Sequence, residues 1–158
     1  MLLPDHIGVG KALRHLDGSG RRFTDIDFSG TAFEWVRLTG ASLTNCSFSD
    51  CTFVGLIADS VTITDCSFEN TTIVSSVFAG AQIVRSSFLG ATADQINFNG
   101  IEAENTDFSD ASLRGSRFLG ARLTAVRFVN CDIKGTLFRY SDRNEVSYKH
   151  SNHEEAHF

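Results

Sequence analysis

Histidine and cysteine side chains are the groups in this sequence with the clearest capacity for chemistry. The histidines are confined to the two ends of the chain, at His6, His15, His150, His153 and His157. General acid–base catalysis needs groups held within hydrogen-bond reach on a rigid frame. The last three histidines could bind a metal ion if they shared one side of a helix, and otherwise belong to a solvated polar tail. We adopt the second interpretation and expect a non-enzymatic protein without a cofactor or metal site.

The bulk composition excludes several classes of protein. The 158 residues are 42% hydrophobic with 1 Pro and 13 Gly, which is typical of one folded domain. A net charge of −5 argues against direct binding to nucleic acid. The first ten residues resemble no signal peptide and no apolar run reaches transmembrane length, so we expect a cytoplasmic protein without membrane contact. The four cysteines lack CxxC spacing, which favours reduced thiols over a disulfide framework.

The elements that would position any site are revealed by a period of five residues. Every fifth residue from Phe23 to Phe138 is apolar, and all 14 Phe, including Phe158, fall in this one register. The position two residues earlier, from Ile26 to Thr136, holds only small or aliphatic side chains, and all four cysteines occur there. Within each unit the pattern is therefore inward, outward, inward, the alternation of a short strand.

The fifth position of each unit is rich in Gly, Asp and Asn, residue types that tolerate positive φ in tight turns. A short strand followed by a corner, repeated many times, predicts a coil. The segments TGASLTNCSF, SDASLRGSRF and LGARLTAVRF resemble the pentapeptide-repeat family over residues 21–138. The resemblance implies an all-β, right-handed quadrilateral parallel β-helix, a solenoid with four units per 20-residue coil. Residues 21–138 would form about six coils and a rod about 30 Å long.

A 20-residue coil predicts which inward side chains lie above one another. One predicted aromatic column consists of Phe28, Phe48, Phe68, Phe88, Phe108 and Phe128. The opposite column consists of Leu38, Ala58, Phe78, Phe98, Phe118 and Phe138. Cys46 and Cys66 would be neighbours in adjacent coils, either as packed thiols or as a disulfide.

Both ends of the solenoid need caps. Residues 1–20 are predicted to form a short N-terminal capping helix that begins near Pro4, with Ile7, Leu13 and Leu16 on one apolar face. Residues 139–158 would be a degenerate seventh coil, a cap or a dimerisation tail. The resemblance implies a homodimer through this end, with Tyr148 and Phe158 in the contact.

Charge bears on the functions that the resemblance implies, one of which is mimicry of DNA by proteins that bind DNA gyrase and protect it from quinolones. Such a mimic needs a dense acidic stripe. Residues 41–110 carry nine acidic residues and one basic residue, but residues 111–143 carry two acidic and seven basic. The 20-residue stacking predicts four ion pairs between coils that weaken the acidic field: Asp65–Arg85, Asp94–Arg114, Glu102–Arg122 and Asp107–Arg127.

The other functional hypothesis is a scaffold for a protein partner whose identity the sequence does not give. Val54 and Val74 would stack on the outside of one face, and Ile57 and Val77 on the next face across a corner. This cluster is either a partner-binding surface or a consequence of the preference of β-branched residues for strands. Trp35 occupies a corner where Gly or Asp is usual. It would be an exposed anchor for the partner or would pack against the N-terminal cap.

Overall fold

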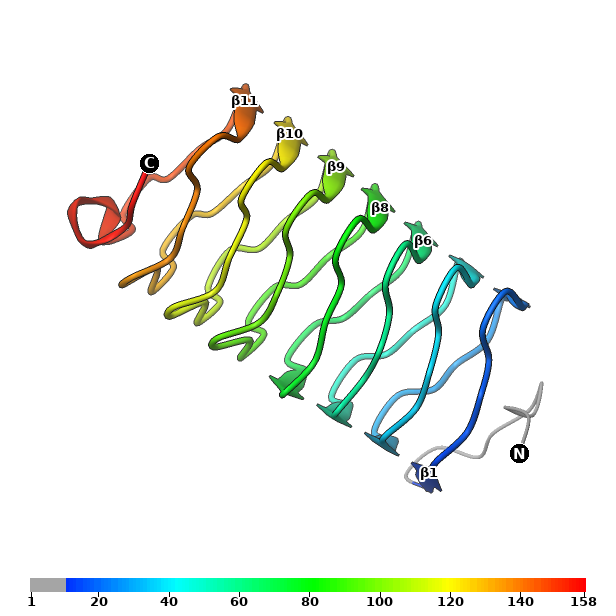
Figure 1. Ribbon diagram of the computed structural model, residues 1–158. Coiled ribbons are helices and arrows are strands. Elements are labelled where there is room, and N and C mark those ends of the chain that lie inside the picture. Colours follow the sequence, from blue (N-terminus) through cyan, green and yellow to red (C-terminus); the bar gives the residue numbers. More distant parts are fainter. Residues whose placement is uncertain (1–10) are drawn as a thin grey trace.

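The computed structural model describes residues 11–158 and is an all-β parallel solenoid of about seven turns (Figure 1). We define coil 1 as residues 11–30, and each later coil begins 20 residues further on. Each coil has four sides of five residues. In coil 1, face A is residues 11–15, face B is 16–20, face C is 21–25 and face D is 26–30.

Backbone hydrogen bonds between adjacent coils form one parallel sheet on face A and a second parallel sheet on face C. The sheet on face A has the order β1-β3-β5-β7, and the seven-stranded sheet on face C has the order β11-β10-β9-β8-β6-β4-β2. Every pairing joins residues 20 apart, as in Phe33 with Phe53. The strands of face A are β1 (Ala12–Arg14), β3 (Ala32–Glu34), β5 (Thr52–Val54) and β7 (Thr72–Val74). Those of face C are β2 (Arg22–Thr24), β4 (Ser42–Thr44), β6 (Thr62–Thr64), β8 (Gln82–Val84), β9 (Glu102–Glu104), β10 (Arg122–Thr124) and β11 (Asp142–Asn144).

Faces B and D carry no extended strand and are joined by isolated parallel bridges such as that between Ile57 and Val77. The chain turns at the fifth residue of every unit. All 28 of these residues from His15 to His150 have positive φ, and only 10 of them are Gly. The left-handed conformation is unfavourable for a bulky side chain, and at corners such as Trp35 and Arg85 a backbone hydrogen bond to the next coil holds it, from Trp35 to Val54 and from Arg85 to Glu104.

The core is a narrow stack of side chains from the four faces. Phe28 and Phe48 stack with ring centroids 4.9 Å apart, and the column continues through face D to Phe128 and Tyr148, which are 5.3 Å apart. The column on face B becomes aromatic at Phe78 and continues at spacings of about 5 Å to Phe158. The ten phenylalanines of the two predicted columns are all buried.

The prediction of a capping helix over residues 1–20 is wrong for residues 11–20. Ala12–Arg14 is strand β1, which pairs with β3, and Leu16 is buried at 6% exposure. By pairing with coil 2 this segment forms hydrogen bonds between coils and buries Leu16, whereas a helix would leave the backbone groups of β3 on that side without these partners. The remaining part of the predicted cap, residues 1–10, lies outside the described residues.

The C-terminal residues 139–158 complete the seventh coil and begin an eighth. Strand β11 pairs with β10, and His157 bridges to Leu137 on face B. Arg143 and His153 depart from the apolar pattern, yet the coil persists. The guanidinium of Arg143 lies 4.8 Å from the centroid of the Phe158 ring, and His153 begins the 3-10 helix η1 (His153–Glu155). The rod therefore has about seven turns where the sequence predicted about six.

Candidate interaction surface

The groups that could do chemistry are dispersed in the structure. Within residues 11–158 no group of three His, Cys, Asp or Glu side chains is placed to hold a metal ion. His150 is a corner residue, His153 lies in η1, and His157 continues face B. None of the helical segments in the described part of the chain has the length and apolar character needed to span a bilayer.

The cysteines are buried free thiols. Cys46 and Cys66 are neighbours in adjacent coils, and the backbone N–H of Cys46 points to Sγ of Cys66 at 3.5 Å. The Cys46 side chain and burial raise the pKa of the Cys66 thiol. Burial raises the pKa of Cys51 and of Cys131 to about 11. These thiols are packed core groups that act as small hydrophobic residues.

Ion pairs between coils follow the predicted spacing in three of four cases. Nε of Arg85 lies 2.7 Å from Asp65, and Nη1 of Arg122 lies 3.3 Å from Glu102. Arg127 approaches Asp107 at 4.0 Å.

The fourth prediction, an ion pair between Asp94 and Arg114, is wrong. The guanidinium of Arg114 turns to Asp132 at 3.0 Å. The Asp94 carboxylate instead accepts hydrogen bonds from the hydroxyl of Ser112 and the backbone N–H of Arg114. A carboxylate with these two donors is already satisfied, which leaves the side chain of Arg114 free to reach the next coil.

The outward aliphatic side chains lie where the sequence placed them, across the corner between faces A and B. Val54 and Val74 are partners in the pairing of β5 with β7. Ile57 and Val77 are joined by a bridge on face B. Val74 is 46% exposed and Ile57 is 36% exposed, whereas Val54 and Val77 are partly covered.

Trp35 extends this cluster, a connection that the sequence did not show. It occupies the corner of coil 2 with φ of 55°. Its ring lies over Gly55, the corner residue of coil 3, where a Cβ would overlap the ring. Gly55 lies between Val54 and Ile57 in the chain, so the indole covers the corner between these two residues, whereas the corner between Val74 and Val77 is the exposed Ser75. Trp35 remains 57% exposed. We name Trp35, Val54, Ile57, Val74 and Val77 the corner patch.

The two predicted dimer residues have different environments. Tyr148 is packed beneath the last residues, and burial raises its pKa to about 12. Phe158 stacks on Phe138 with a centroid distance of 5.2 Å and is 43% exposed. Together with Arg143, Lys149 and His153, these rings line a shallow depression at the C-terminal end of the rod. Dimerisation through this end stays a prediction.

Sequence reasoning missed one exposed group on face B. Tyr140 is 89% exposed and occupies a corner with φ of 60°. Arg139 precedes it, and Arg117 lies on the same face one coil earlier. The 20-residue register could have identified Tyr140 as unusual, because the corresponding corners of the six earlier coils are Gly or Ser.

Comparisons with known proteins agree with this architecture. The family model described as "pentapeptide repeat region" matches residues 41–118 and 61–138, and that described as "pentapeptide repeats (8 copies)" matches residues 22–57. No curated protein matches the sequence.

Several solved structures have similar folds. QnrB1, a plasmid-mediated fluoroquinolone resistance protein, is 19% identical with a TM-score of 0.41, over 96% of this chain and 80% of that one. Rfr23 from the cyanobacterium Cyanothece is 14% identical with a TM-score of 0.38, over 95% of this chain and 89% of that one. HetL from the cyanobacterium Nostoc sp., which is involved in heterocyst differentiation regulation, is 13% identical with a TM-score of 0.27, over 94% of this chain and 89% of that one. Such similarities carry no information about function. The family models span most of the coils, and the chain belongs to the pentapeptide-repeat family.

Proposed function

We propose that this protein is a non-enzymatic scaffold that binds a protein partner through the corner patch. The observation that carries the proposal is the position of Trp35, whose exposed ring lies over Gly55, the corner between Val54 and Ile57. Aromatic residues surrounded by aliphatic ones are typical of the centres of protein interfaces.

The conformation of Trp35 supports a role beyond folding. A bulky residue at positive φ costs on the order of 1–3 kcal/mol, and more than half of this side chain remains in water. The covered part of the ring offsets a cost of this size, whereas the exposed part adds nothing to folding. A partner that covers the indole would bury the rest of its apolar surface.

The test is partner capture from the native host with two double variants. Ile57→Lys/Val77→Lys places two charges in the patch, and we expect loss of the captured partner. Thr62→Lys/Gln82→Lys adds the same charge on face C and should capture normally. The protein has 1 Trp, so binding of the captured partner should also shift the fluorescence of Trp35 to shorter wavelength. Equal capture by both double variants would exclude the corner patch as the interface.

The second candidate, mimicry of DNA toward DNA gyrase, is favoured by the acidic middle of the rod. Residues 41–110 have a net charge of −8. Three of those acids, Asp65, Glu102 and Asp107, face arginines of the next coil, which weakens the field that a mimic needs. A supercoiling assay with purified gyrase discriminates the candidates. Inhibition of supercoiling at micromolar protein would support the DNA-mimic function. Normal supercoiling would exclude it and leave the scaffold function as the remaining candidate.

A further inference from the structure

Two arginines on face B differ from the arginines that form ion pairs between coils on the other faces. Arg85, Arg122 and Arg127 each pair with an acid of the preceding coil. The guanidiniums of Arg117 and Arg139 are exposed and make no ion pair or hydrogen bond with any residue in the range 11–158. The acids on face B are confined to the first and third coils. This part of face B therefore presents uncompensated positive charge.

The two arginines belong to a compact array on adjacent coils. Arg117 bridges to Leu137 through the backbone, and Arg139 follows Leu137 by two residues. Leu119 likewise follows Arg117 by two residues, and it precedes Arg139 by one coil of 20 residues. The four positions form a square in which arginines and partly exposed leucines occupy opposite diagonals. Since adjacent coils are separated by about 4.8 Å, both guanidiniums can reach carboxylates of one extended segment.

Tyr140 borders this array, and its backbone conformation is energetically unfavourable. Its φ of 60° is unfavourable for an aromatic residue, and its side chain is 89% exposed, so folding gains little from it. The equivalent corners of the two preceding coils are Gly100 and Gly120, which adopt the same conformation without strain. A strained, exposed aromatic residue that packs against nothing indicates a binding role rather than a structural one.

We propose that Arg117, Arg139 and Tyr140 bind an acidic, extended segment of a protein. The guanidiniums would each bind a carboxylate, the Tyr140 hydroxyl would donate a hydrogen bond to a third, and the leucines would contact the methylene groups of the acidic side chains. We name these three residues the cationic site. It lies on the same face as Ile57 and Val77, about three coils or 14 Å further along the rod.

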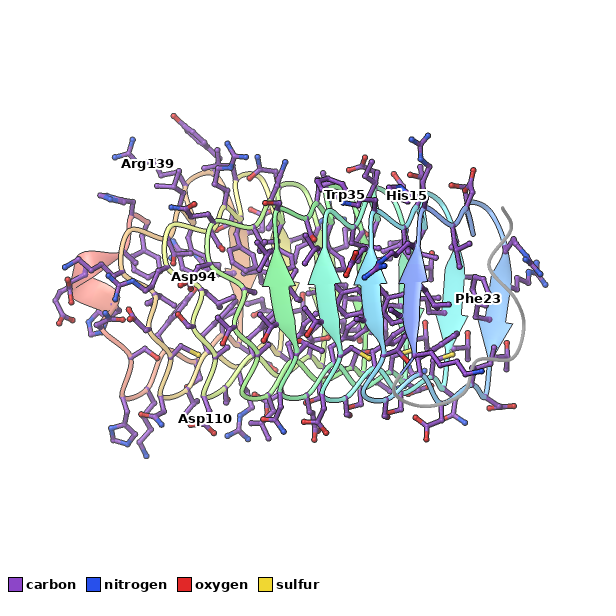
Figure 2. The ribbon with its side chains drawn as sticks, turned by 90° about the horizontal axis from the view of Figure 1, so that it is seen from below. His15, Phe23, Trp35, Asp94, Asp110 and Arg139 are labelled. Atoms are coloured by element: carbon purple, nitrogen blue, oxygen red, sulfur yellow. The ribbon has the colours of Figure 1, made fainter. Side chains whose placement is uncertain are left out.

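The distribution of charge favours an acidic protein segment over nucleic acid. Arg139 projects from the side of the rod opposite Asp110 (Figure 2). The acids of face D and its corner, such as Asp50, Glu69 and Asp110, would repel a long polyanion that wrapped beyond face B. A short acidic segment confined to face B avoids them. The cationic site is also independent of the corner patch, because the two share no residue.

The experiment measures binding of fluorescently labelled octaglutamate to the full chain by anisotropy, with oligo-dT of eight nucleotides as the competing class of ligand. We expect octaglutamate to bind more tightly than oligo-dT, with an affinity that falls as salt is raised. The variant Arg117→Glu/Arg139→Glu should weaken binding at least about tenfold. Tyr140→Gly should weaken it about threefold while leaving the thermal midpoint unchanged or higher, because strain is removed.

The matched control is Arg122→Glu/Arg127→Glu, which makes the same change in net charge on faces C and D. This control should bind octaglutamate within about twofold of the wild type. Equal losses in the two double variants, tighter binding of oligo-dT, or no octaglutamate binding at millimolar concentration would each overturn the proposal. The corner-patch variant Ile57→Lys/Val77→Lys should leave octaglutamate binding intact, so failure of one site is distinguishable from failure of the other.

Discussion

In coils 2 and 3 the aromatic ring that accompanies the face D ring lies on face A, at Phe33 and Phe53, whereas in coils 4–7 it lies on face B, from Phe78 to Phe138. Face D supplies an aromatic ring in every coil, from Phe28 to Tyr148. Each coil from the second to the seventh therefore encloses two aromatic rings and smaller residues. A coil of constant circumference must enclose a nearly constant volume, but either of two faces can supply the second ring.

The outer surface of face A changes near the same place. Its sheet ends at β7, and in the later coils isolated parallel bridges, such as that between Ser112 and Asp132, replace the three-residue strands. Coils 3 and 4 present Val54 and Val74 there, whereas the later coils present Asp94, Arg114 and Lys134. Side chains add to the backbone hydrogen bonds that continue between these coils: Arg114 binds Asp132, Asn152 binds the same carboxylate, and Lys134 binds Glu155. On face A the valines of coils 3 and 4 thus lie between the Arg14–Glu34 ion pair of coils 1 and 2 and the polar network of the later coils.

The largest effect is expected from removing one of the two aromatic rings that a coil of the C-terminal half encloses. Phe98→Ala should lower the free energy of unfolding by about 3–5 kcal/mol, because it removes a buried ring that stacks on Phe78 and Phe118. Adding Ala93→Phe moves the ring to face A of the same coil, the arrangement of coils 2 and 3. The double variant should recover more than half of the loss in urea unfolding. No recovery would show that the choice of face is fixed rather than interchangeable.

A smaller difference in stability is expected between alanine substitutions at two glycines that occupy equivalent corners of the two halves. Gly55 and Gly115 both have positive φ, at 68° and 64°. Either change to Ala strains the corner by about 1–2 kcal/mol. The new methyl group at residue 55 would also displace the Trp35 ring, whereas at residue 115 it meets Cγ of Gln95 at 3.5 Å, an ordinary contact. Gly55→Ala should therefore be the more destabilising in thermal melts and should alter Trp35 fluorescence, and Gly115→Ala should leave the spectrum unchanged.

The smallest effect concerns local opening of the two halves. Burial raises the pKa values of Cys51 and Cys131 alike to about 11, so their labelling by iodoacetamide at neutral pH depends on how often each coil opens. Cys131 should label faster, because the residues above it are partly held by surface hydrogen bonds from Asn152 to Asp132. Asp132→Ala should accelerate labelling of Cys131 without changing Cys51, as measured by peptide mapping. Faster labelling of Cys51 would reverse the ranking of the halves.

Much of the fold could be predicted because the core pattern is strict. The register of Phe residues identified the inward face, and the 20-residue period placed Phe28 above Phe48. The N-terminal boundary could not be predicted as well, because Leu13 and Leu16 also fit one face of a helix, and the strand was favoured by pairing with β3, a contact distant in sequence. The aliphatic part of the corner patch was predicted from stacking, but the contact of Trp35 with Gly55 was not.

The sequence by itself determined a coil of five-residue units, since a period of five with apolar inward residues and turn-forming corners must bury the rings inside, and the resemblance to pentapeptide-repeat proteins implied four units per coil. Only the tertiary structure decided how the outer side chains associate. Arg114 had carboxylates on both neighbouring coils and reached Asp132, Trp35 lay over the following coil, and Arg117 and Arg139 were left without acidic partners. The physical reason is that the 20-residue spacing fixes which backbones are neighbours. A long outward side chain can then reach several residues at similar distance, and its rotamer selects among them.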